Sequence, residues 1–94
     1  METLNGQIIS TDFKDNYYSL LIMAELSLSN GCGVTLGFSN TSTFKNLFKV
    51  CGIQSYKDIL GKCIRVRISS GVVKEIGHIV KDEWYEYPSL KKIN

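Results

Sequence analysis

The sequence predicts a small α+β domain in which a bent, mostly antiparallel five-stranded sheet packs on one main helix. Apolar and polar residues alternate over much of the chain, which is typical of half-buried strands. One segment, 44–51, instead has apolar residues at helical spacing. Glycine-containing turn signals separate the segments. The 94 residues fit a single domain, 1–94, with a frayed tail at 89–94, and the expected order is βββ-α-short α-ββ.

The first part of the chain predicts three strands. Residues 4–13 mix β-branched and polar types without a helical period, and residues 17–29 carry apolar side chains at the even positions. Asn30-Gly31 indicates a type I′ hairpin turn, in which both central residues have positive φ. A third strand is expected at 32–38, where two glycines share one face. Those glycines indicate either a bulge or the close approach of a helix, another chain or a ligand.

The main helix is predicted from Phe44, Leu47, Phe48 and Cys51, which lie at i, i+3, i+4 and i+7. Polar residues at 39–43 offer several N-caps. A glycine at 52 stands where a left-handed C-cap belongs, with an isoleucine after it as the apolar contact. A second short helix is expected at 55–61.

The last third of the chain predicts a hairpin followed by an extended segment. Residues 63–69 alternate cleanly, with Arg65 and Arg67 on the polar side, and a Ser-Gly turn follows. Residues 72–81 have apolar side chains on both faces, which indicates a bulge near Gly77 or cover on both sides. Residues 82–88 continue as an extended, aromatic-rich edge.

Composition excludes several classes of protein. Hydrophobic residues make up 44% and charged residues 21%, which is ordinary for a globular domain, and a net charge of +2 neither indicates nor excludes nucleic acid. Three distant cysteines and one histidine predict a reduced cytosolic protein without a metal site or cofactor. No apolar run is long enough to cross a membrane, and the N-terminus has no signal-peptide pattern.

The residues suited to specific chemistry gather on this last hairpin and the segment after it, which hold the only histidine, the only tryptophan and both arginines. We take nine of them as candidate partner-binding residues: Lys62, Arg65, Arg67, Lys74, His78, Lys81, Trp84, Tyr85 and Tyr87.

His78 has three interpretations: it fixes the hairpin by hydrogen bonding to the backbone, it contacts nucleic acid or a partner, or it acts as a general base oriented by Asp82 or Glu75. Asp82 is four residues along the same strand, about 13 Å away, so a catalytic set would need residues from other strands. We therefore expect that the chain is not an enzyme and that it has no catalytic residues.

The arginines and aromatic residues also have two interpretations each. Arg65 and Arg67 share a face that suits a phosphate or a carboxylate, although ordinary solvated ion pairs explain it equally. Trp84 either packs over the sheet or serves as a stacking platform. Tyr85 and Tyr87 lie together on the other side of their strand and, if exposed, suit either a protein interface or single-stranded nucleic acid.

Two segments, Gly61-Lys-x-Ile-Arg-Val66 and Ile76-Gly-His-Ile-Val-Lys-Asp-x-Trp84, resemble a group of short accessory proteins of bacteriophages and prophages, most of which have no assigned function. The resemblance implies a phage protein in the cytoplasm of the bacterial host cell. Proteins of this type are often inhibitors of host defence, anti-CRISPR proteins among them. We therefore expect a non-enzymatic inhibitor that binds a host defence protein complex such as a CRISPR–Cas effector. The alternative is a small nucleic-acid-binding module that uses the basic and aromatic sheet face.

A homodimer is a further expectation. If residues 82–87 form an edge strand that carries three aromatic rings, its backbone groups and rings need cover, and a second copy of the chain is the simplest cover. Pro88 would end the pairing because it has no N–H to donate.

Overall fold

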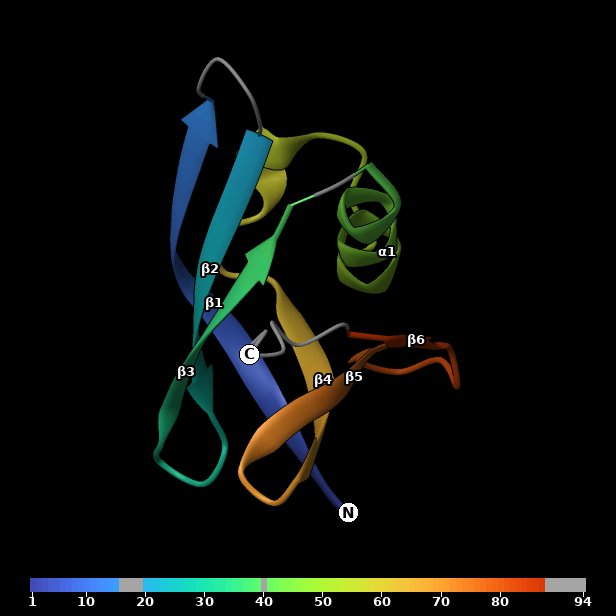
Figure 1. The fold of residues 1–94 in the computed structure, drawn as a ribbon. Helices are drawn as coiled ribbons and strands as arrows, with labels where there is room; N and C mark the ends of the chain where they lie inside the picture. Colours follow the sequence, from blue (N-terminus) through green and yellow to red (C-terminus); the bar gives the residue numbers. More distant parts are fainter. Residues whose placement is uncertain (16–19, 40, 88–94) are drawn as a thin grey trace, which may run out of the picture.

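The computed structural model describes residues 1–15, 20–39 and 41–87. Its elements are β1 (Glu2–Asp15), β2 (Leu20–Leu28), β3 (Gly33–Phe38), α1 (Thr41–Cys51), the 3-10 turn η1 (Tyr56–Asp58), β4 (Cys63–Ser69), β5 (Val72–His78) and β6 (Trp84–Glu86) (Figure 1). The α+β class is confirmed. The described residues form six strands rather than the five expected, because part of the aromatic segment pairs with β5 as β6. The predicted strand residues 17–19, Pro88 and the tail 89–94 lie outside the described residues.

The strand order is β3-β2-β1-β4-β5-β6, and every pair is antiparallel. β1 lies at the centre, since its first half pairs with β4 and its longer second part pairs with β2. The connection through α1 and η1 returns the chain to the free side of β1. Strands β1 to β4 are therefore a Greek key, with three hairpin-connected strands and a fourth beside the first. Figure 1 shows the strands curling, with α1 beside them.

Two features of β1 allow this curl. The pairing with β2 shifts at Ile9, and such a bulge bends a strand and increases its twist. Gly6 pairs with a residue of β2 on one side and of β4 on the other. A Cβ at Gly6 would lie 2.9 Å from Leu26 Cδ2, so a larger residue here would push the core apart.

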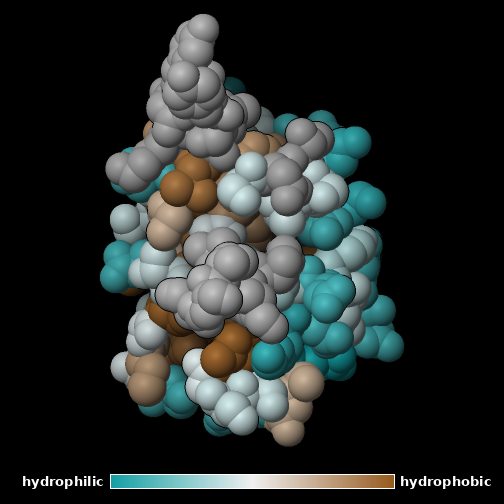
Figure 2. Space-filling model, in the orientation of Figure 1, coloured by the Kyte–Doolittle hydropathy of each residue, from teal (hydrophilic) through white to brown (hydrophobic). Residues whose placement is uncertain are grey.

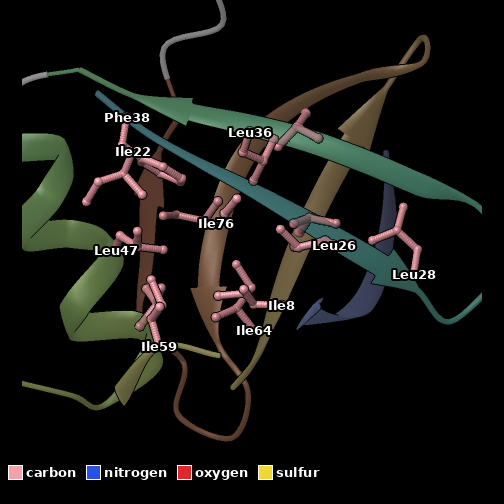
Figure 3. Packing of buried hydrophobic residues seen from close by; sticks show 14 residues of the cluster. Ile8, Ile22, Leu26, Leu28, Leu36, Phe38, Leu47, Ile59, Ile64 and Ile76 are labelled. Carbon is pink, nitrogen blue, oxygen red and sulfur yellow. The ribbon is translucent and has the colours of Figure 1, made fainter. Parts of the chain in front are cut away.

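The core lies between the curled sheet and α1, and no polar or charged side chain of the described part is buried in it. Figure 3 shows Leu47 of α1 pointing toward the strands that carry Ile22 and Ile76. Burying one such side chain stabilises the fold by about 1.5–3 kcal/mol. The buried cluster consists of Ile8, Ile22, Ala24, Leu26, Leu28, Leu36, Phe38, Leu47, Val50, Ile59, Ile64, Val66, Val73 and Ile76.

The end of α1 follows the sequence prediction. Gly52 has a φ of +71°, the Ile53 N–H donates to the Phe48 carbonyl at 3.1 Å, and the Gly52 N–H donates to the Lys49 carbonyl at 3.2 Å. This is a Schellman cap, which satisfies two of the free carbonyls at the helix end.

The short helix expected at 55–61 is wrong beyond the 3-10 turn η1. The chain has to leave the helical path because Ile59 is buried in the core and the next residues pair with β1. The Gly61 N–H donates to the Ile8 carbonyl at 2.8 Å, and the Lys62 carbonyl accepts from the Ile8 N–H at 2.8 Å.

No helix of the described residues is long and apolar enough to cross a membrane.

The type I′ turn predicted at Asn30-Gly31 is wrong. Only Gly31 has positive φ there, and the Leu28 N–H donates to the Cys32 carbonyl at 2.8 Å, which closes a three-residue loop. Asn30 keeps negative φ, and its Oδ1 accepts from the Cys32 N–H at 3.0 Å. The type I′ geometry occurs instead at the Ser-Gly turn 70–71, where φ is 55° and 76°.

The bulge of the β4–β5 hairpin lies at Lys74 and not near Gly77, because Glu75 pairs with Arg67 while the residue before Lys74 pairs with the next residue of β4. The alternative expectation was that both faces of this strand are covered. It applies at Gly77, because the Trp84 ring lies over the outer face of the strand there. β5 ends at His78 rather than at Lys81.

Candidate functional site

On the outer face of β4, β5 and β6, opposite the core, the Trp84 ring packs on the backbone of a glycine, Gly77. Gly77 pairs with Arg65 of β4 on one side and with Trp84 of β6 on the other. A Cβ at Gly77 would lie 2.5 Å from Cε3 of the Trp84 ring. The ring therefore rests directly on the main chain of β5, a position that glycine alone permits.

Two arginines pack against this ring. The Arg67 Cζ lies 3.7 Å and the Arg65 Cζ 4.8 Å from the centroid of the Trp84 ring. Such cation–π contacts contribute about 0.5–1 kcal/mol each at exposed sites. Arg67 Nη1 also donates to Glu75 Oε1 at 2.6 Å, and the two side chains are 35% and 34% exposed. We call Arg65, Arg67, Trp84 and Glu75 the Arg–Trp stack.

Arg65 connects this stack to the loop between β5 and β6. Its Nε donates to the His78 carbonyl at 2.7 Å, and its Nη2 donates to the Lys81 carbonyl at 2.7 Å. The guanidinium is therefore held in place by main-chain oxygens, and it orders residues 79–83, which we call the 79–83 loop.

His78 fixes the end of the hairpin by hydrogen bonding to the backbone, which is the first of the three interpretations given above. Its Nδ1 accepts hydrogen bonds from the Val80 and Lys81 N–H groups, both at 3.1 Å, so the ring holds the backbone that follows it. The two acids considered as its orienting partners are engaged elsewhere. Asp82 Oδ1 accepts from the Trp84 indole N–H at 3.2 Å, and Glu75 pairs with an arginine of the stack.

Tyr85 lies on the opposite side of β6 from Trp84 and packs against the core. Its hydroxyl donates to Glu83 Oε2 at 2.6 Å, and this hydrogen bond is the main reason that the pKa of Tyr85 is raised. Lys49 of α1 places its Nζ 5.7 Å from the centroid of the Tyr85 ring.

Figure 2 shows hydrophilic residues gathered on the side of the molecule where α1 and β6 lie.

Tyr87 joins the two edges of the curled sheet. Its hydroxyl donates to the Gly37 carbonyl at 3.0 Å and accepts from the Gly37 N–H at 2.8 Å, while its ring meets Phe38 edge-on at 5.5 Å. Burial raises the pKa of Tyr87. The register of β2 with β3 is unbroken, so the glycines of β3 mark no bulge there, and the side chains nearest the missing Cβ of Gly37 are Met23, with Sδ at 3.3 Å, and Leu21 of β2.

The structure divides the nine candidate residues into groups. Arg65, Arg67 and Trp84 belong to the stack, Lys81 lies in the adjacent 79–83 loop, and His78 is the last residue of β5 before that loop. The two tyrosines pack on the other side, against the core. Two lysines stay apart from the stack and are exposed, in the bulge of β5 and just before β4: Lys74 and Lys62.

Two features were not predicted from the sequence: the packing of the Trp84 ring on Gly77, and the exposure of Val80 at the tip of the loop. The available signal for the first was a glycine within a predicted strand; no signal in the sequence distinguished Val80 from Ile79 beside it. Within the described residues, no three His, Cys, Asp or Glu side chains lie close enough together to hold a metal ion.

Comparisons with protein families, curated proteins and solved structures find no match to this chain.

Proposed function

We propose that the chain is a non-enzymatic binding protein that contacts a protein partner through the Arg–Trp stack. Tryptophan and arginine are the side chains most enriched where interfaces gain their binding energy. Here both arginines are already fixed by hydrogen bonds to Glu75 and to main-chain carbonyls, so binding would cost little further side-chain entropy.

The mixture of charges on this face favours a protein over a polyphosphate. Glu75 neutralises Arg67, and Glu86 lies directly opposite Glu75 on β6. Two donors of Arg65 are also taken by carbonyl oxygens. A surface with both signs of charge and an aromatic centre is typical of protein interfaces.

The biological role that we propose is inhibition of a bacterial defence complex, such as a CRISPR–Cas effector, in the cytoplasm of a phage-infected cell. The support is the resemblance of the two segments to phage accessory proteins. The same segments supply two members of the stack, Arg65 and Trp84, together with Gly77 under the ring and with His78 and Asp82 beside it.

A capture experiment tests this proposal. Tagged wild-type chain is expected to recover components of a defence complex from lysate of a CRISPR-bearing host and to raise plaque counts on that host. Arg67→Ala should reduce both effects, whereas Lys45→Ala on the exposed side of α1 should not. Circular dichroism would verify that both variants fold. Recovery of no defence component together with unchanged plaque counts would contradict the proposal.

Binding of single-stranded nucleic acid is the second candidate, and the topology favours it. The OB-fold, which often binds oligonucleotides, is a partly open Greek-key barrel of five strands; here β5 and β6 extend the Greek key of β1 to β4 by two strands. This is an analogy between folds and not between sites. The outer face of β2 and β3, the usual site in that fold, here presents Glu25 and Thr35, so the bases would have to stack at Trp84.

Fluorescence anisotropy with labelled single-stranded DNA and RNA separates the two candidates. Nucleic-acid binding predicts an affinity that falls steeply as salt rises, and a loss of binding in Trp84→Ala. A flat anisotropy trace at low ionic strength removes this candidate and leaves the protein partner.

A further inference from the structure

The outer edge of β3 carries main-chain groups that point away from the rest of the sheet. β3 is the first strand in the order, so it pairs with β2 alone. The Leu28 N–H donates to the Cys32 carbonyl at 2.8 Å, and the register that follows is unbroken. Hydrogen bonds between antiparallel strands alternate along each strand, so the N–H and C=O groups of Gly33, Thr35 and Gly37 point away from β2.

Of these three residues, Gly37 alone has its edge-facing groups bonded within the described part of the chain. The Tyr87 hydroxyl accepts from the Gly37 N–H at 2.8 Å and donates to the Gly37 carbonyl at 3.0 Å. No hydrogen bond among the described residues takes up the edge-facing groups of Gly33 and Thr35, and both residues are exposed. An open edge of this kind is a template for one more strand.

Tyr87 also sets the direction in which the chain reaches this edge. Its N–H donates to the Lys74 carbonyl at 2.8 Å, so it continues the pairing of β6 with β5. Since every neighbouring pair of strands is antiparallel, β3 and β5 run in the same direction and β6 runs in the opposite direction. A chain that leaves Tyr87 in the direction of β6 therefore passes Gly37 first and Gly33 last.

The segment after Tyr87 is long enough to cover this edge. It has seven residues, 88–94, which reach about 23 Å when extended, whereas the edge from Gly37 to Gly33 is about 13 Å long. Its first residue is Pro88, which has no N–H to donate. That residue follows Tyr87 directly and so comes next to Gly37, whose N–H and carbonyl already have a partner.

We propose that residues 88–94 add to β3 as a further antiparallel strand, which closes the barrel between β3 and β5. Leu90 then pairs with Thr35, and Lys92 pairs with Gly33. Each pair exchanges two hydrogen bonds, because alternate residues of the added strand turn their N–H and C=O groups toward β3. The segment is preferred over a strand of another protein because it is already attached beside the edge, whereas a foreign strand loses translational and rotational freedom when it binds.

The outer face of β3 has room for a leucine at position 90. On either side of Thr35 along that face are Gly33 and Gly37, which have no side chains. The Met23 side chain packs over Gly37, with its Sδ 3.3 Å from the position that a Cβ would take. A leucine opposite Thr35 therefore covers bare backbone and adds to the apolar surface that Met23 begins.

Hydrogen exchange measured by NMR on the full chain tests the pairing. The Gly33 and Thr35 amides are expected to exchange at least about 10-fold more slowly than in a chain that ends at Tyr87, or in Leu90→Pro, which lacks the N–H. The Val34 amide points toward β2 and should stay protected in all three proteins, which verifies that they fold. Equal exchange of the two edge amides in all three proteins would overturn the inference.

A disulfide tests the register without a truncated chain. In a full chain whose exposed cysteines, Cys32 and Cys63, are replaced by serine, Thr35→Cys with Leu90→Cys should oxidise to an intramolecular disulfide, because paired residues of antiparallel strands lie within disulfide reach. Thr35→Cys with Lys91→Cys is the matched control. Position 91 lies on the other face of the added strand, so this pair should crosslink at least about 10-fold more slowly. Equal rates for the two pairs would refute the register.

A second copy of the chain is the competing occupant of this edge. It predicts that protection of the Gly33 and Thr35 amides rises with protein concentration and that the cysteine pair 35 and 90 forms disulfides between two chains. Either result would refute the proposal, whereas protection that is independent of concentration supports it. The inference does not depend on the proposed protein-binding function, so capture experiments through the Arg–Trp stack succeed or fail independently of it.

Discussion

At the scale of single residues, the contact of Trp84 with Gly77 decides what the outer face looks like. The ring occupies the space of a missing Cβ, and the two arginines of the stack pack against the ring. Residue type alone indicated Trp84 and the arginines as candidates. The pairing of Gly77 with Trp84 was not predictable, because it depends on where the chain turns back after His78.

Replacing Gly77 tests this contact. The added methyl group of Gly77→Ala would displace the Trp84 ring, and we expect a loss of about 1–3 kcal/mol in the free energy of unfolding, as for other overpacked sites. Gly33→Ala is the control, since the nearest atom to its Cβ would be a carbonyl oxygen at 3.6 Å. Urea denaturation followed by tryptophan fluorescence measures both variants. Equal stability of the two would show that the ring does not need the glycine.

The three cysteines should differ in reactivity. All are free thiols; Cys32 and Cys63 are exposed, whereas burial raises the pKa of Cys51 to about 12. Because the thiolate is the reactive form, a disulfide reagent at pH 8 should label two thiols quickly and Cys51 slowly. Cys51→Ser is expected to remove only the slow phase. Fast labelling of all three thiols in folded protein would contradict the buried position of Cys51.

At the scale of elements, local patterns predicted most boundaries. The cap of α1 followed from a glycine and an isoleucine, and β4 followed from strict alternation. The turn after β2 was mispredicted because the Asn30 side chain binds the backbone directly and so removes the need for positive φ. The end of β5 was mispredicted because His78 caps the loop with its ring, a use of histidine for which the sequence carries no pattern.

His78→Ala tests this cap. The Val80 and Lys81 N–H groups would lose their acceptor, so we expect their hydrogen exchange to become faster, with about 0.5–1.5 kcal/mol lost for each bond. Exchange measured by NMR in the core strand β1 should hardly change. Lys74→Ala, at an exposed position on the same strand, serves as the control. Unchanged protection of both amides would show that His78 is free for another role.

At the scale of the whole molecule, the sheet is a barrel left open between β3 and the β5–β6 hairpin, with Tyr87 reaching across to Gly37. The sequence predicted a bent sheet on a helix but not this closure, because the contact joins residues that are 50 positions apart. The rings that motivated a homodimer have cover within the chain: Trp84 lies on β5, and Tyr85 and Tyr87 pack on the core.

Alkaline pH should weaken the wild type more than Tyr87→Phe. Burial raises the pKa of Tyr87 above its ordinary value of 10.0, so the folded state holds the phenol proton more tightly than the unfolded chain does. The corresponding stability is complete below pH 10 and is lost as the pH rises through the folded pKa. Denaturation midpoints measured from pH 8 to 11 give the comparison. The pKa of Tyr85 is also raised, first by its hydrogen bond to Glu83, and Tyr85 is present in both proteins, so the difference between them isolates Tyr87.

We expect the full chain to be a monomer in the absence of a partner. The aromatic rings of the 84–87 segment are covered within the chain, so what the described part of this segment offers for pairing is the short backbone edge of β6. Size-exclusion chromatography with light scattering at high micromolar concentration measures the mass. A dimeric mass that becomes monomeric in Trp84→Ala would restore the homodimer through this edge.

The central position of β1 in the sheet has a consequence for folding during synthesis on the ribosome. One side of β1 pairs with β2, which follows it directly, but Glu2 pairs with Ile68 of β4 on the other side. At about 5–20 residues per second, that second side waits several seconds for its partner strand to be synthesised. Neighbouring nascent chains on one messenger meet during this interval, so the yield of folded protein should depend on how slowly ribosomes are loaded.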